Sequence, residues 1–443
     1  MMKLRGKSVR LTITVLASVS VLFGCGTRQD NPETNKPAAN PMKYDEAFSI
    51  TFFNATGSNE AYFRENTEPF MKKVFPNVTI NYIQTAKGST IQELITAGNI
   101  PDIMLINSSQ VISYNNLGLL EDLTPLAKTN NVDLSRFDDH MMETIKKFTP
   151  KGELYVLPWS HLPMALYYNK SIFDKFGVAY PKEGMTWDDV AALTRKLSRM
   201  DGGVAYRGFD MNRSTFLRLN PLSLSYVDPK MEKAIANTDG WREFITTFSD
   251  LYKIPGNELP AKSVTSDQAF FKDKTLAMNV TYGNFPTPEN AEMIEAWQSI
   301  DLVSLPMFKT APDTGTQYSG ASLAVSKTSK VKDKAMLLIA AATSDEAQKH
   351  GAAIGRYPTV KNKDVLDQFG QGTPQLSSKN LKALQRLKVA ATTFSSEYDA
   401  ATLPIITSTF DDILKGTVDM ATGLREADEK MNAKIAEEKA KAK

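Results

Sequence analysis

The sequence predicts an α/β protein whose first part is built around a parallel sheet. Between residues 48 and 107, strand-like segments alternate with helical segments, and the third strand contains an uninterrupted apolar run over 103–106. Parallel strands joined by helices are covered on both faces, which accounts for an apolar run without polar alternation. A second series of strands and helices begins near residue 151, and 443 residues supply material for two or three domains.

The first 24 residues have the pattern of a secretory signal peptide. Four basic side chains precede the uncharged run Leu11–Gly24, which is too short for a membrane-spanning helix. These four residues also supply the basic excess, because the formal charge of +2 becomes 48 basic against 50 acidic side chains without them. A balanced mature chain argues against a nucleic-acid partner.

Cys25 is the only cysteine, so the chain has no intramolecular disulfide and no site built from several thiolates. The sequence Leu22-Phe23-Gly24-Cys25 resembles a bacterial lipobox, in which the cysteine is acylated and becomes the mature N-terminus. The resemblance implies lipid anchoring at the extracytoplasmic face of the cell membrane, with palmitate among the chains. Residues 25–46 then form the lipidated cysteine and a flexible tether. The alternative is a plain signal peptide followed by a buried thiol.

The first α/β region is predicted from its periodicity. Phe48–Asn54 is a strand, residues 59–74 form a helix, and Val78, Ile80 and Tyr82 alternate as a second strand. A short helix over 89–97 is closed by Gly98, and 101–107 form the third strand.

Small polar residues follow each of these strands. They are residues 54–58, 84–87 and 107–110. Ligands of open α/β sheets bind beyond the carboxyl ends of the strands, so Asn54, Ser58 and Ser108 are candidate ligand contacts. The alternative is that they are turn and helix-capping residues, which Asn and Ser often are.

The second region has its own strand and helix signals. We predict a strand over 164–169, a helix over 170–176, and a helix capped by Thr186 and Asp189. From Asp239, six large apolar residues fall on one helical face and are predicted as core, as is Trp187. The tail from Leu424 reads as a solvent-facing helix with charged pairs four residues apart.

Several short motifs follow one another in a characteristic order. They are Tyr155-Val-Leu-Pro158-Trp159, Leu166-Tyr-Tyr-Asn169-Lys170, Phe173-Asp-Lys-Phe-Gly177, Thr186-Trp-Asp-Asp189, Ala269-Phe-Phe-Lys-Asp-Lys274, Tyr282-Gly-Asn284 and Tyr318-Ser-Gly320. This order, behind a lipobox, resembles the carbohydrate-type extracellular solute-binding proteins of ABC importers, which include the maltodextrin-binding proteins.

The resemblance implies a periplasmic-binding-protein-like fold of two α/β lobes with three hinge crossings and a ligand cleft between them. On this chain it maps to an N-terminal lobe of 47–157 plus 299–325 and a C-terminal lobe of 158–285 plus 326–443, with 286–298 connecting. It also implies hinge closure on a sugar, delivery to membrane permease subunits, and no enzymatic activity. We expect a monomer without cofactor.

A sugar site needs flat aromatic surfaces for C–H faces and planar polar groups for hydroxyls. Trp159 follows Pro158 at the expected first crossing, and we interpret it as a stacking residue. His161, two residues later, is interpreted as a hydrogen-bonded structural residue. The other candidate ligand contacts are Asp210, Tyr282, Asn284, Tyr318 and Arg356. A surface ion pair is the alternative for Arg356, and a hinge or turn is the alternative for the glycine motifs.

Common catalytic motifs are absent from the sequence. It contains no phosphate-binding G-x-x-x-x-G-K-[ST] loop, no H-E-x-x-H zinc motif and no G-x-S-x-G elbow, and we expect no metal site. Two alternatives to a transport binding protein stay open. One is a membrane-anchored extracellular glycosidase, since 50 acidic residues always supply candidate carboxylate pairs. The other is a surface-binding protein without a transport role.

Overall fold

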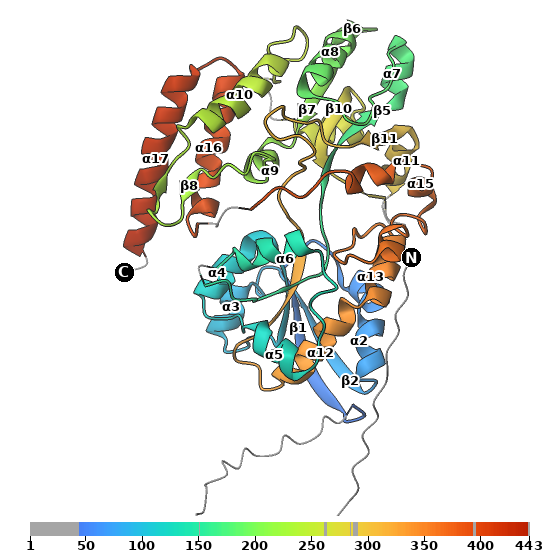
Figure 1. Cartoon of the computed structure of the whole chain (residues 1–443), viewed down its shortest axis with the longest axis vertical. Helices are drawn as coiled ribbons and strands as arrows, with labels where there is room; N and C mark the ends of the chain where they lie inside the picture. Colours follow the sequence, from blue (N-terminus) through green and yellow to red (C-terminus); the bar gives the residue numbers. More distant parts are fainter. Residues whose placement is uncertain are drawn as a thin grey trace, which may run out of the picture. The chain divides into compact units, whose positions relative to one another are not determined.

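The computed structural model describes residues 44–149, 151–260, 264–283, 285–286, 291–392 and 396–441. The predicted signal peptide, Cys25 and the tether up to residue 43 lie outside the described residues. No helix among those described combines the length and the apolarity needed to cross a membrane. The described chain is mixed α/β, as predicted, and contains two five-stranded sheets (Figure 1).

The first sheet has the strand order β2-β1-β3-β12-β4. Its strands are β1 (Phe48–Asn54), β2 (Val78–Gln84), β3 (Ile103–Asn107), β12 (Ala321–Val325) and β4 (Leu157–Pro158). β1 pairs in parallel with both β2 and β3, which confirms the predicted parallel trio. β12 enters from far along the chain and runs antiparallel to β3.

The helices of this part follow from local signals, with one difference from prediction. Its elements are α1 (Glu60–Asn66), α2 (Glu68–Val74), α3 (Ile91–Thr96), η1 (Ser108–Gln110), α4 (Val111–Asn116), α5 (Leu123–Thr129), α6 (Asp139–Lys146), α12 (Lys332–Ala342) and α13 (Asp345–Ala353). The single helix expected over 59–74 is two helices, α1 and α2. Pro69 stands in the first turn of α2, where its missing N–H costs nothing but where it ends any continuous helix from α1.

The second sheet has the order β11-β5-β10-β7-β6. Its strands are β11 (Ile300–Val303), β5 (Met164–Asn169), β10 (Leu276–Tyr282), β7 (Val204–Met211) and β6 (Arg199–Asp201). β5 is antiparallel to both neighbours and every one of its six residues is buried, while β7 runs parallel to β10. The predicted strand over 164–169 is therefore confirmed.

Aromatic side chains form the core beside the second sheet. The surrounding elements are α7 (Lys170–Phe176), α8 (Trp187–Leu197), α9 (Arg213–Arg218), β8 (Val227–Asp228), β9 (Lys233–Ala234), α10 (Asp239–Tyr252), η2 (Gln268–Lys272) and α11 (Ala291–Ser299). All six apolar residues of the predicted α10 stripe are buried. Trp187, predicted as core, meets Phe248 edge-on with ring centroids 4.7 Å apart, and the capping box of Thr186 and Asp189 is present.

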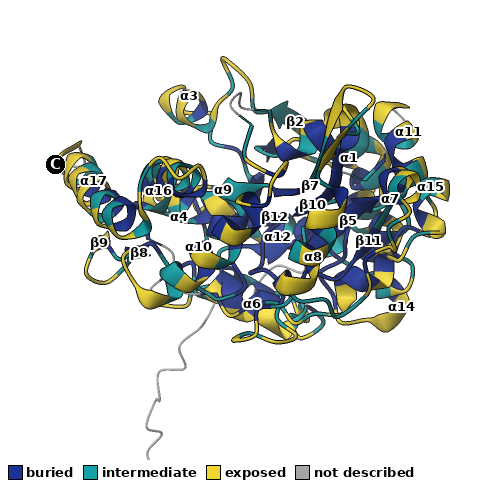
Figure 2. Cartoon of the chain, turned by 90° about the horizontal axis from the view of Figure 1, so that it is seen from above, coloured by how far each residue is buried: buried dark blue, intermediate teal, exposed yellow. Residues whose placement is uncertain are grey.

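The last part of the chain adds the helices α14 (Lys363–Leu366), α15 (Pro374–Ser377), η3 (Leu381–Gln385), α16 (Asp399–Leu414) and α17 (Met420–Lys441). α17 packs on α16 through a stripe that includes Leu424, Met431 and Ile435, and Figure 2 shows its other face exposed. Lys430 pairs with Glu426 and Lys441 with Glu437, four residues apart. The predicted solvent-facing tail helix is confirmed.

Two parts of the expected lobe boundaries are wrong. Residues 300–303, assigned to the N-terminal lobe within 299–325, form β11 and pair with β5 in the second sheet. Residues 332–353, assigned to the C-terminal lobe within 326–443, form α12 and α13, which pack on α1, α2, α5 and β12. A strand's apolar pattern shows that it is buried, but it does not say which sheet it joins, and this explains the error.

The chain passes between the two sheets at 159–163, at 304–320 and again after α13. Tyr282, one of the candidate ligand contacts, ends β10 inside the second sheet. The first two crossings are joined by backbone hydrogen bonds: the Leu162 amide donates to the Ser319 carbonyl at 2.8 Å, and the Ser160 amide donates to the Ala321 carbonyl at 3.0 Å.

Candidate functional site

A pocket of about 440 Å³ lies where both lobes and a crossing segment contribute walls. We call it the Arg218 pocket. It is lined by Ser108, Ser109, Gln110, Ile112, Ser113, Phe148, Arg218, Leu219, Leu224, Ser225, Tyr226, Gln317, Tyr318, Thr392, Ser396, Glu397, Asp399, Ala400 and Leu403. The lining combines aromatic rings with hydroxyl, amide, carboxyl and guanidinium groups, and its size is that of a small-molecule site.

Backbone contacts fix the polar walls of this pocket. The Ser108 amide donates to the Gly320 carbonyl at 2.8 Å, which ties the end of β3 to the crossing segment. On the opposite wall, the Gln317 amide donates to the Leu219 carbonyl at 3.0 Å. The Gln317 side-chain amide donates to the Asn220 carbonyl at 3.2 Å. The crossing thus holds residues of both lobes at one cavity.

Two ionisable groups face the pocket without pairing with each other. Arg218 has no hydrogen-bond or ion-pair partner among the described residues, and burial lowers the pKa of its guanidinium against the attraction of Tyr226, Tyr282 and Asp399. Burial raises the pKa of Asp399 to about 7, although the Ser396 amide donates to its Oδ2 at 3.0 Å. The pocket therefore offers a solute the unpaired guanidinium of Arg218 and the carboxyl of Asp399, which titrates near neutral pH.

We expect the partly buried Asp399 carboxyl to make stability fall as pH rises. Its pKa is about 7 in the folded protein and 3.8 for the free group, so the folded state binds the proton more tightly. The stabilisation is present below about pH 4 and is lost as pH rises to 7, by about 1.4 kcal/mol per pH unit. Urea unfolding of wild type and Asp399→Asn at pH 5, 6 and 7 measures it. A stability difference between the two proteins that does not change with pH contradicts the assignment.

A second pocket, of about 220 Å³, adjoins the first crossing. We call it the Arg356 pocket. It is lined by Tyr62, Ser160, His161, Leu162, Pro163, Gly283, Phe285, Pro286, Ile354, Gly355, Arg356 and Tyr357. The Tyr318 hydroxyl, from the wall of the Arg218 pocket, donates to the Ser160 carbonyl at 3.2 Å. The two pockets are therefore neighbours across the crossing segments.

Three predicted contacts line these pockets. Ser108 and Tyr318 lie in the Arg218 pocket, and Arg356 lies in the second. Tyr282, at the end of β10, is close enough to Arg218 to act on its pKa, although it lines neither pocket. Asn284 lies outside the described residues.

Asn54 and Ser58 are brought together, but they bond to each other. The Asn54 side-chain nitrogen donates to the Ser58 carbonyl at 2.8 Å and to the Tyr82 hydroxyl at 2.8 Å. Its oxygen accepts from the Thr56 amide at 2.7 Å, and the side chain is 1 % exposed. In this structure these residues shape the turn after β1, as in the alternative stated above, and line neither pocket.

Asp210 is fully buried in a network of ions away from both pockets. Its carboxylate pairs with Arg207 at 2.9 Å and with Arg213 at 3.0 Å, and it accepts from the Tyr252 hydroxyl at 2.6 Å. Arg213 continues to Asp411 at 2.6 Å. The network neutralises the charge of Asp210 within the second lobe. In this structure Asp210 therefore binds protein side chains and does not face a solute site.

Trp159 is not an open platform in this structure. The ring is 6 % exposed and lines neither pocket. The guanidinium carbon of Arg356 stands 4.2 Å from the ring centroid, and Tyr62 meets the ring edge-on at 6.2 Å. Arg356 itself donates from Nη2 to the Ala347 carbonyl at 2.7 Å. The ring therefore stacks on a protein cation at the expected first crossing.

The charged groups that the sequence analysis missed are Arg218 and Asp399. Arg218 ends α9, Asp399 begins α16, and nearly half of the chain separates them. No motif surrounds either residue. Only the return of the C-terminal helices to the second sheet brings them to one cavity.

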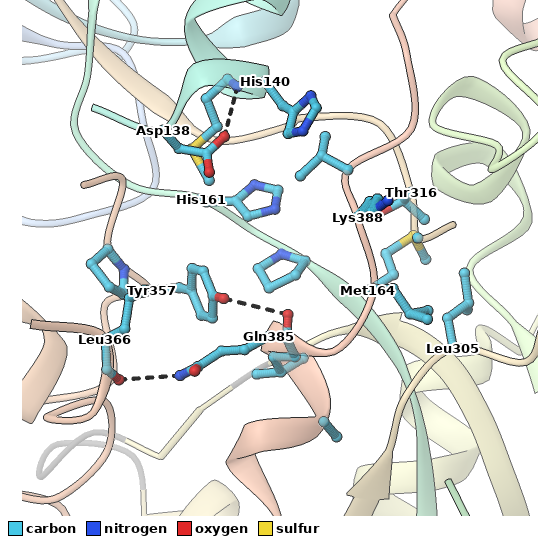
Figure 3. Close-up of a pocket in the computed structure, with 18 of the residues that line it drawn as sticks. Asp138, His140, His161, Met164, Leu305, Thr316, Tyr357, Leu366, Gln385 and Lys388 are labelled. Atoms are coloured by element: carbon cyan, nitrogen blue, oxygen red, sulfur yellow. Dashed lines mark hydrogen bonds between the residues drawn. The ribbon is translucent and has the colours of Figure 1, made fainter. Parts of the chain in front are cut away.

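A third pocket, of about 330 Å³, lies behind the crossings (Figure 3). Gly315 and Thr316 line it, whereas the next residues, Gln317 and Tyr318, line the Arg218 pocket. His161 stands in it near Asp138 and Tyr357, its Nδ1 2.9 Å from the Ser319 carbonyl oxygen. Burial lowers the pKa of His161 to about 4, so the ring is neutral at pH 7. The interpretation of His161 as a hydrogen-bonded structural residue is confirmed.

The described part of the chain holds no candidate metal site, because no three His, Cys, Asp or Glu side chains converge there as ligands would.

The profile of the family described as bacterial extracellular solute-binding protein matches residues 55–349. The chain belongs to this family. The match covers every strand of the first sheet except β1, the first two crossings and the whole of the second sheet.

Individual relatives of this solute-binding protein are distant. A binding protein of Brucella abortus is 29 % identical over 149 residues, 32 % of this chain and 33 % of that protein. An uncharacterized ABC transporter extracellular-binding protein of Pyrococcus horikoshii is 24 % identical over 296 residues, 57 % of this chain and 63 % of the other. The matches thus span one third to less than two thirds of these curated relatives.

Solved structures share the fold over nearly the whole described chain. A sugar transporter of Rhizobium etli, in an open conformation, has a TM-score of 0.71 at 22 % identity and covers 87 % of this chain and 100 % of its own. The sugar-binding protein MalE of Xanthomonas citri has a TM-score of 0.70 at 16 % identity, covering 88 % and 98 %. The two-lobe periplasmic-binding-protein-like fold predicted from the sequence is confirmed.

Proposed function

We propose that this solute-binding protein captures a sugar or oligosaccharide outside the cell and delivers it, chemically unchanged, to the permease subunits of an ABC importer. The observation that carries the proposal is the Arg218 pocket, where Ser108 of the first lobe, Tyr318 of the crossing and Arg218 of the second lobe face one cavity. Rings for C–H faces and planar polar groups for hydroxyls are what a sugar needs. Two proteins that share the fold, the sugar transporter of Rhizobium etli and the sugar-binding protein MalE of Xanthomonas citri, support the same choice.

An oligosaccharide is favoured because the Arg218 pocket continues outward. A cavity of about 480 Å³ shares Phe148, Ser396 and Glu397 with it. This extension is also lined by both lobes, with Lys147 on one side and Lys230 on the other. Two joined cavities of this size exceed the needs of a single sugar ring.

The mechanism follows from the position of the cavity. A solute that contacts both lobes binds the closed arrangement better than the open one, and this differential affinity shifts the population toward closure. The crossings act as the hinge because they join the two sheets covalently. A permease that recognises the closed form then receives only loaded binding protein.

The proposed function includes a lipid anchor on Cys25. The lipid would hold the protein near the permease and raise its local concentration, so a modest affinity for the permease suffices. Replacing Cys25 with serine should release the protein from the membrane fraction into the medium. Retention of the serine variant on membranes, measured by fractionation, would refute the anchor.

A glycosidase is the second candidate, because Glu397 and Asp399 both line the Arg218 pocket and the Asp399 pKa is raised. A carboxyl acid paired with a second carboxylate is the minimum for glycoside hydrolysis. Binding without reaction is favoured because the Glu397 carboxylate is solvent-exposed and accepts from Asn116 of the first lobe at 3.1 Å.

Calorimetry and chromatography on the same samples separate the two functions. The protein is titrated with a panel of neutral and acidic oligosaccharides, and each mixture is then held for a day and chromatographed. Transport binding predicts heat with at least one sugar and full recovery of that sugar. Heat followed by shorter products would establish the glycosidase, and absence of heat with every sugar would contradict both.

A further inference from the structure

The polar groups of the Arg218 pocket favour one class of sugar over others, if the proposed function holds. Arg218 lines the cavity and has no hydrogen-bond or ion-pair partner among the described residues. Arg207 and Arg356 have guanidinium nitrogens that are buried and unbonded, whereas those of Arg218 are not among the buried ones. A guanidinium only donates hydrogen bonds. The open side of Arg218 therefore calls for an acceptor, and the planar fork suits a carboxylate.

Asp399 adds a second donor to the same cavity. Its Oδ2 already accepts from the Ser396 amide, and burial favours the protonated form of the carboxyl near pH 7. A protonated carboxyl keeps one O–H to give. Although it faces the cavity with Arg218, no ion pair joins the two groups, so neither satisfies the other.

The remaining groups around this pair do not oppose a negative charge strongly. From the first lobe, the walls are uncharged: Ser108, Ser109, Gln110, Ile112, Ser113 and Phe148. From the second lobe, Tyr226 and Tyr282 are close enough to act on the pKa of Arg218. Burial raises the pKa of the Tyr226 phenol, which is therefore uncharged at pH 7. Glu397 is the one other acid of the lining, and it is exposed to water and bonded to Asn116. Its repulsion is weakened by solvent.

We infer that the Arg218 pocket receives an acidic substituent of the sugar, a carboxylate as in a uronic acid residue, held by the Arg218 guanidinium and the Asp399 carboxyl. The solute is then an acidic oligosaccharide whose neutral rings lie along the extension shared with Phe148. Binding takes up a proton, because the carboxylate is held by protonated Asp399. Affinity for the acidic sugar therefore rises as pH falls through 7.

Matched sugar pairs test this inference. Trigalacturonate is compared with its carboxyl-reduced trigalactoside, and an aldotetraouronic acid with xylotetraose, by calorimetry on the full chain. We expect at least one acidic member to bind tenfold or more tightly than its neutral counterpart. Arg218→Gln should reduce that preference to within about threefold, because a hydrogen bond to a charged group contributes about tenfold or more in affinity. Arg195→Gln, an exposed arginine on α8, should leave it unchanged.

The pH dependence of the affinity for the acidic sugar is a second test, because a purely structural role of Arg218 would not produce it. The affinity of wild type for the acidic sugar should rise by about tenfold in total between pH 8 and pH 6 and level off below pH 7, where Asp399 is already mostly protonated. Asp399→Asn should bind with a flat profile. Neutral sugars that bind as tightly as their acidic partners would overturn the inference and leave sugar binding intact. Failure of all four sugars would count against the proposed function, and this inference falls with it.

Discussion

Replacing Trp159 with alanine lowers the free energy of unfolding by about 3–5 kcal/mol, which is the usual cost of removing a buried tryptophan. The ring is 6 % exposed and lies 4.2 Å from the Arg356 guanidinium carbon. Its loss leaves a cavity beneath a buried charge that has no ion-pair partner among the described residues. Urea unfolding followed by circular dichroism gives the number.

Trp159→Phe is the control, because it keeps an aromatic face for Arg356 and should lose much less stability. The sequence analysis interpreted Trp159 as a stacking platform for sugar, and the same variants decide between the two roles. A loss of sugar affinity in Trp159→Ala with less than about 1 kcal/mol of destabilisation would show that the platform interpretation was right.

Replacing Gly320 with alanine should push two crossing segments apart. A Cβ at this position would lie 1.9 Å from the Ser160 carbonyl oxygen and 3.1 Å from the His161 Cα. Both are backbone atoms, so no side chain can swing away. The Trp159 and Ser160 amides donate to the Ala321 carbonyl at 2.9 and 3.0 Å. Moving the segments apart would lengthen or break these two hydrogen bonds. We expect a stability loss of about 3 kcal/mol or more, the upper range for overpacking.

Gly57→Ala is the matched control for Gly320→Ala. Nothing lies within 4 Å of a Cβ built at Gly57, so the change should stay within about 0.5 kcal/mol. Urea unfolding of both variants under one set of conditions makes the comparison. Equal stabilities for Gly320→Ala and Gly57→Ala would mean that the crossings are not packed as described.

Local signals predicted much of the fold. The parallel trio around β1, the capping box at Thr186 and the buried stripe of α10 each follow from the period of the apolar residues or from a capping residue. The two lobe assignments that were wrong, those of β11 and of α12 with α13, depend on contacts between distant segments. An amphipathic pattern specifies a buried face without naming its partner.

The same distinction explains the candidate site. Ser108 and Tyr318 were found because strand ends and family motifs mark them, and both line the Arg218 pocket. Asp210 carries the same chemistry as a ligand-binding carboxylate, but two arginines, one of them on the neighbouring α9, neutralise it. Arg218 and Asp399 stand in segments without motifs, and only tertiary packing makes them neighbours. Side-chain chemistry predicts what a residue can bind, whereas its partners decide what it does bind.

The central claim is that two lobes close on a sugar, and a distance across the mouth of the cleft tests it most directly. Leu117 follows Asn116 of the first lobe, and Met231 follows Lys230 of the second. Both side chains are exposed beside the cavity of about 480 Å³ that extends the Arg218 pocket. Spin labels on Leu117→Cys and Met231→Cys, with Cys25 replaced by serine, report this distance by electron double resonance. The account predicts a shorter and narrower distribution when the sugar identified by calorimetry is added. An unchanged distribution at saturating sugar would contradict it.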